Sequence, residues 1–209
     1  MKLSFVFAFV FFLTCQNLHA EEEETFLADT IDICLNLPSS PDAVDANFAK
    51  IGWQKKQGKE AEKLASNILY SLLFTIRHRS ENLAYTYKNS AFMTASILGN
   101  SRLRPNQPTY TSNGMRLGVF GVRENSGYCV FTGPKSATVK IENKLGVIVK
   151  ETLPYLRSYQ GKIGENEIAV REIDIDKFQK TRPSLAFENF ELYQKLEDEG
   201  LRETNLYIK

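Results

Sequence analysis

A chain of 209 residues is long enough to form one domain with a sizeable hydrophobic core. Its 26 basic and 25 acidic residues nearly balance, and loss of Lys2 with the signal peptide predicted below leaves 25 of each. This neutrality argues against a general nucleic-acid binder and against strong attraction to anionic membranes, because both need a surplus of Lys and Arg.

The first twenty residues have the three-part layout of a cleavable signal peptide. Lys2 supplies a positive charge, an apolar run extends from Phe5 to Leu13, and the segment ends at Ala20. The apolar run is too short for a bilayer core, which needs roughly 20 apolar residues. We therefore predict a signal peptide at 1–20 and a single exported domain at 21–209, periplasmic or secreted, with no stable membrane span.

An alternative interpretation concerns Cys15, which follows the apolar run and would be the lipid-modified first residue of a lipoprotein. A small residue is expected just before such a cysteine, and Thr14 fits that position poorly. Soluble export is therefore the favoured interpretation. No Asn is followed by x-Ser or x-Thr, and the lack of this glycosylation signal favours a bacterial periplasm.

Two cysteines, Cys34 and Cys129, remain after the signal peptide is removed. An even number of cysteines in an oxidising compartment favours a disulfide. This bond would join the predicted N-terminal helix to the predicted sheet. The alternative is a pair of buried, reduced cysteines.

The first part of the exported domain is predicted to be helical. Pro41 fits a first helical position, and Gly52 fits the position of a C-terminal glycine cap. Further on, Leu64, Ile68 and Leu72 recur every four residues and mark one apolar stripe. The predicted helices are 25–37, 41–51 and 59–79.

The next segment, 82–100, carries mixed signals. Leu83, Tyr85 and Tyr87 alternate as in a strand, and we predict a strand for the whole segment. Residues 102–114 gather prolines, asparagines and other polar residues, which predicts a polar loop within the domain.

Strand patterns dominate after this loop. Residues 115–123 and 127–132 are separated by three residues, as in a hairpin. The other predicted elements are a helix at 136–145, a strand at 167–175, a helix at 184–199 and a strand at 204–208. Together these elements predict an α+β fold, in which N-terminal helices pack on a mainly antiparallel sheet formed by the C-terminal half.

No motif in the sequence carries a specific chemistry. His78 is the single histidine after residue 20, so zinc sites with several His ligands cannot form and a Ser-His-Asp hydrolase would depend on this residue alone. Arg77 and Arg79 flank it, and positive charge at a helix C-terminus explains all three residues. We predict no catalytic residue, no metal and no cofactor.

The remaining candidate is a binding surface around the polar loop. The side chains proposed to contact a partner are those of Arg102, Arg104, Tyr110, Arg116 and Arg123. A long loop on a disulfide-linked scaffold is a common place for function, and tyrosine suits recognition surfaces. We predict a non-enzymatic protein that binds another envelope or secreted protein. The alternatives are a secreted hydrolase with unrecognised acidic catalytic residues, and a carrier of a small apolar ligand.

Overall fold

The computed structural model describes residues 25–77, 83–99, 108–120, 127–134, 148–152, 155–181, 200 and 202–208. The helices are 25–35, α2 (Pro41–Lys50), α3 (Gly58–Arg77), α4 (Leu83–Gly99) and α6 (Ile175–Thr181). The strands are β1 (Gln54–Lys55), β2 (Thr109–Ser112), β3 (Met115–Phe120), β4 (Tyr128–Gly133), β5 (Ile148–Thr152), β6 (Leu156–Ile163), β7 (Asn166–Ile173) and β8 (Thr204–Ile208).

Within these residues the strands form one antiparallel sheet in the order β1-β2-β3-β4-β8-β7-β6-β5. The last strand of the sequence, β8, lies in the interior of the sheet between β4 and β7. Most helices precede most strands in the sequence, so the predicted α+β class is confirmed.

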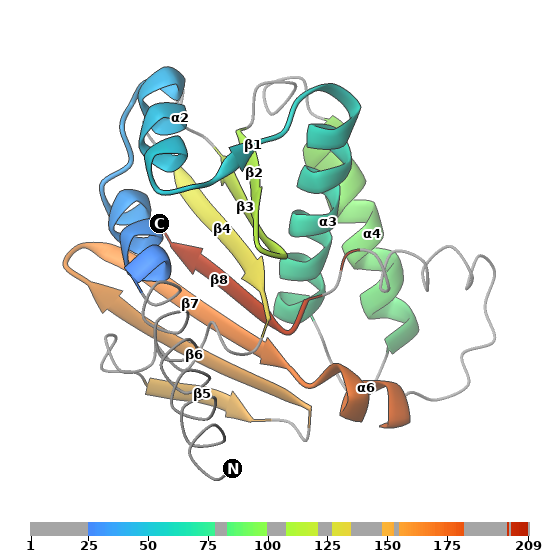
Figure 1. Cartoon of the computed structure of the whole chain (residues 1–209). Helices are drawn as coiled ribbons and strands as arrows, with labels where there is room; N and C mark the ends of the chain where they lie inside the picture. Colours follow the sequence, from blue (N-terminus) through green and yellow to red (C-terminus); the bar gives the residue numbers. More distant parts are fainter. Residues whose placement is uncertain are drawn as a thin grey trace, which may run out of the picture.

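The sheet lies between two layers of helices (Figure 1). Side chains alternate across it, so that Leu117 and Phe131 pack against helix 25–35 and α2. Phe120 and Val130, from the same two strands, pack on the opposite face against Ile68 of α3. Helix α4 packs mainly on α3. Burial on both faces explains why β3 and β4 are almost continuously apolar.

The sequence predictions for the first helices are confirmed at helix 25–35, α2 and α3. Helix α2 begins at Pro41, as predicted, although Ser40 makes no side-chain capping hydrogen bond. Gly52 follows the helix with a φ of 97°, a backbone conformation that glycine adopts without steric cost.

The strand predicted at 82–100 is wrong, because residues 83–99 form α4. The buried side of this helix carries Thr86, Ser90 and Thr94 at intervals of four residues. Phe92, by contrast, is 70% exposed. Hydrophobic periodicity cannot detect a helix whose buried stripe is hydroxyl-bearing, so three alternating apolar residues misled the prediction.

The strands 167–175 and 204–208 correspond to β7 and β8, and the hairpin strands correspond to β3 and β4. The predicted polar loop is shorter than expected, because β2 occupies 109–112. Strands β1, β5 and β6 and helix α6 were not predicted. The helices predicted at 136–145 and 184–199 lie outside the described residues, as do the signal peptide and His78.

One buried side chain in the sheet gives a stability prediction. Thr132 is fully buried, and its Oγ1 has no hydrogen-bond partner among the described residues. A buried hydroxyl without a partner costs about 1 kcal/mol or more, so Thr132→Val should raise the free energy of unfolding by about 1 kcal/mol. Thermal denaturation measures this as an increase in Tm of about 2–4 °C.

Thr204→Val is the matched control on the neighbouring strand. Thr204 is also fully buried, but its Oγ1 donates a hydrogen bond to the carbonyl oxygen of Pro134 at 3.0 Å. This substitution removes a satisfied hydrogen bond and should lower Tm. A decrease in Tm for Thr132→Val would show that its hydroxyl is satisfied in solution.

Candidate functional site

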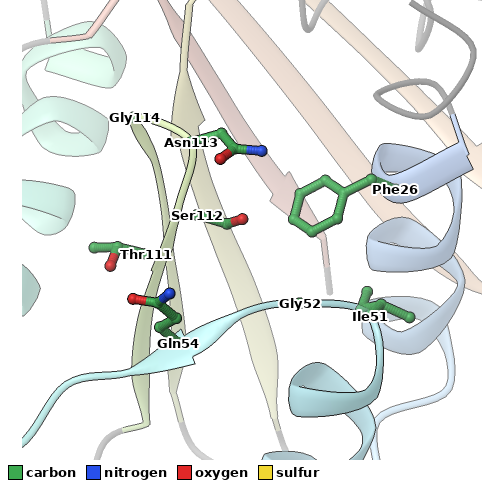
Figure 2. Close-up of a pocket in the computed structure, with 8 residues that line it drawn as sticks. All are labelled: Phe26, Ile51, Gly52, Gln54, Thr111, Ser112, Asn113 and Gly114. Carbon is green, nitrogen blue, oxygen red and sulfur yellow. The ribbon is translucent and has the colours of Figure 1, made fainter. Parts of the chain in front are cut away.

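A groove of about 380 Å³ opens between helix 25–35, the end of α2 and the β2–β3 hairpin. The residues that line it are Phe26, Ile51, Gly52, Gln54, Thr111, Ser112, Asn113 and Gly114. Figure 2 shows the ring of Phe26 on one side of this space and the side chains of Ser112 and Asn113 on the other. The volume falls within the usual range for small-ligand sites.

The hairpin turn fixes one wall of the groove. Asn113 and Gly114 both have positive φ, 46° and 76°, and join Ser112 to Met115, which pair across the hairpin. Positive φ at both central residues is typical of a two-residue type I′ turn, and Asn-Gly is its preferred sequence. The turn is therefore encoded locally, and it holds Ser112 and Asn113 in defined positions.

The aromatic wall is fixed by packing in the core. The Phe26 ring lies 5.1 Å from the ring of Trp53, centroid to centroid. Trp53 is buried, and its Nε1 donates a hydrogen bond to Oγ1 of Thr30 at 2.9 Å, which in turn donates to the carbonyl oxygen of Phe26. This chain of contacts ties the first turn of helix 25–35 to the segment that precedes β1.

A carboxylate connects α2 to β1 and β2. Oδ1 of Asp45 accepts a hydrogen bond from the Tyr110 hydroxyl at 2.5 Å, and Oδ2 pairs with the ammonium group of Lys55. Asp45 lies on α2, Tyr110 on β2 and Lys55 on β1. The contact therefore holds α2, which leads into Ile51 and Gly52, against the strands that carry Gln54 and Thr111.

The predicted disulfide between Cys34 and Cys129 is present, with Cα atoms 5.8 Å apart. It attaches helix 25–35 to β4, and both cysteines are buried. The helix that carries Phe26 is thereby covalently joined to the sheet.

The described members of the predicted partner-binding surface do not share one face. Tyr110 is 1% exposed, because its ring packs 5.1 Å from that of Phe48 and its hydroxyl is engaged by Asp45. Arg116 pairs in register with Thr111, the neighbour of Tyr110, and so lies on the opposite face of the sheet from Tyr110. Its Nη1 donates to the carbonyl oxygen of Gly200 at 3.3 Å. Arg102, Arg104 and Arg123 lie outside the described residues.

The groove residues themselves were missed by sequence reasoning, although one signal pointed to them. The dipeptide Asn113-Gly114 lies between short alternating runs, which is a strong local indication of a hairpin. Assigning this stretch to a polar loop hid the strand before it. Phe26 carried no signal beyond its place on an apolar helix face.

None of the eight lining residues is ionisable, and four of them carry neutral amide or hydroxyl side chains. In the described part of the chain, no three His, Cys, Asp or Glu side chains are grouped so that they could hold a metal ion. The described helices also include none long and apolar enough to cross a membrane.

Comparisons with known proteins give no relative. The chain matches no protein-family model, and searches of curated proteins and of solved structures find no similar protein. Function must therefore be inferred from the groove and the elements that build it.

Buried tyrosines give the protein a predictable response to alkali. Burial, together with the hydrogen bond and the negative charge of Asp45, holds the pKa of Tyr110 well above its ordinary value. Burial, with a smaller effect of Tyr207, raises the pKa of Tyr128 to about 12. The folded state thus keeps protons that the unfolded state loses above pH 10.

Stability should accordingly be constant just below pH 10 and fall between pH 10 and 12. The slope is about 1.4 kcal/mol per pH unit for each tyrosine that is protonated only in the folded state. Urea denaturation across this range, with tyrosinate absorbance in parallel, measures it. Tyr128→Phe should make the decrease shallower, and an unchanged slope would contradict the role of this residue.

Proposed function

We propose that the mature chain is an exported, non-enzymatic binding protein that interacts with another envelope or secreted protein, and that a segment of this partner enters the groove. The observation that carries the proposal is the groove itself, which is built from neutral hydrogen-bonding side chains and one aromatic ring on a rigid frame. The buried Cys34–Cys129 disulfide supports export, because such bonds persist in oxidising compartments.

The composition of the groove favours a polar segment over a small apolar ligand. Phe26 and Ile51 are the two large apolar residues in the lining, whereas Ser112 and Asn113, whose side chains lie on the side of the hairpin that faces Phe26, can each donate and accept hydrogen bonds. A carrier of apolar ligands would instead need a lining that is mainly hydrophobic.

The test is affinity capture from a periplasmic or secreted extract with the oxidised chain. A defined exported protein should be retained, and Ser112→Trp should abolish retention because the indole fills the groove. Ser96→Trp, on the exposed side of α4, is the matched control and should retain the partner as wild type does. Recovery of chaperones alone would contradict the proposal.

The predicted arginine surface is tested in the same experiment. Arg102→Glu combined with Arg104→Glu should weaken capture if the partner also contacts the segment that precedes β2. Retention lost in this double variant but unaffected by Ser112→Trp would show that the partner binds at the arginines and not in the groove.

A further inference from the structure

We infer that the partner segment held in the groove is an uncharged stretch of polypeptide, which stacks a proline or aromatic ring on Phe26 and hydrogen-bonds through amide or hydroxyl groups to Ser112 and Asn113. This inference rests on the proposed function and specifies the chemistry of the partner. Three features of the groove support it.

The first feature is the absence of ionisable groups among the lining residues. A charged side chain that entered the groove would lose part of its hydration and find no opposite charge there, which is unfavourable. Lys55, next to Gln54 in the sequence, is already paired with Asp45 within the protein. An uncharged segment avoids this cost.

The second feature is the half-buried ring of Phe26, which projects into the groove (Figure 2). Trp53 supports the ring from the core side, so little conformational entropy is lost when a ligand packs on it. A flat, rigid partner such as proline or an aromatic side chain makes the largest contact with such a ring.

The third feature is the pair of neutral side chains opposite the ring. Ser112 is half-buried and Asn113 is exposed, and both stand on the rigid Asn-Gly turn. Hydroxyl and amide groups donate and accept at once, as do backbone and side-chain amides of a polypeptide. The groove thus offers complementary partners for a neutral peptide.

The experiment uses Trp53 as a reporter, since it is the only tryptophan of the chain and it contacts Phe26. The probes are short blocked peptides with proline or phenylalanine between asparagine and serine. These should change Trp53 fluorescence saturably and equally at low and high salt. Versions with lysine or aspartate in place of asparagine should bind about tenfold more weakly.

Two substitutions of one residue separate charge from shape. Asn113→Gly keeps the positive φ and removes the amide, and Asn113→Asp keeps the shape and adds a charge. Each should weaken the neutral peptides about tenfold. The inference would be overturned if wild type bound the lysine peptides more tightly than the neutral peptides. It would also be overturned if wild type bound a neutral sugar, chitotriose, saturably and bound no peptide.

Phe26→Ala should also abolish peptide binding, and Phe92→Ala, an exposed phenylalanine on α4, should leave it unchanged. Suppose that wild type captures a partner, that Ser112→Trp does not, and that high salt abolishes capture by wild type. This result would support the proposed function and show that the partner segment is charged, which contradicts the inference. If only chaperones are captured and no peptide perturbs Trp53, the proposed function itself fails.

Discussion

Replacement of Cys34 with serine is expected to lower the free energy of unfolding of the oxidised protein by about 2–5 kcal/mol. The bond joins residues 95 apart in the sequence, so in the chain-entropy account it removes many conformations from the unfolded state. Serine also places a hydroxyl among the apolar side chains that surround Cys34 in the core. The measurement is chemical denaturation of the variant and of wild type under non-reducing conditions.

A second measurement separates the bond from the side chain. With reductant present, the free energy of unfolding of wild type should approach that of Cys34→Ser. The free energy of unfolding of the variant should not change with reductant. In the unreduced, denatured wild type a maleimide should label neither Cys34 nor Cys129. Labelling of both would show that the bond does not form in solution.

Phe48→Ala is expected to cost about 3–5 kcal/mol of stability. Phe48 is fully buried on α2, and its ring lies 5.1 Å from that of Tyr110. Its carbonyl oxygen accepts hydrogen bonds from the backbone of Ile51 and Trp53, so it also sets the path of the chain into the groove. Loss of the ring removes packing that holds α2 on the sheet, and Ile51 and Gly52 of the groove directly follow this helix, so peptide binding should weaken together with stability.

Phe92→Ala is the matched control for this substitution, because the same side chain is removed from a position that is 70% exposed. Its effect should stay within about 0.5 kcal/mol. Urea denaturation measures both effects. If Phe48→Ala and Phe92→Ala lowered the free energy of unfolding equally, the described packing of α2 on the sheet would be contradicted.

The sequence predicted those elements whose signals are local and apolar. Helix α3 has a leucine and isoleucine stripe, and α2 has Pro41 at its start and Gly52 after its end, so both could be found without tertiary information. Helix α4 could not, because its buried side carries threonine and serine. Among the described residues, α4 packs mainly on α3, and this tertiary contact leaves no apolar pattern in the sequence of α4.

The candidate site was harder to predict than the fold. The cysteine pairing followed from residue count and compartment. The groove, however, joins Phe26 to Asn113, which lie far apart in the sequence, and no periodicity indicates that pairing. Tyr110 was placed on the predicted binding surface because it is a tyrosine in a polar stretch. In the structure its hydroxyl donates a hydrogen bond to the carboxylate of Asp45, which allows the ring to be buried.

The interior position of β8 determines when the sheet can be completed. Among the described residues, strands β1–β4 and β5–β7 are two antiparallel groups, and β8 (204–208) joins them by pairing with β4 and β7. During synthesis, which proceeds from the N-terminus, the two groups of strands therefore cannot join into one sheet until β8 is available. Completion of the sheet therefore depends on pairing between segments far apart in the sequence, and such non-local contacts form slowly in folding.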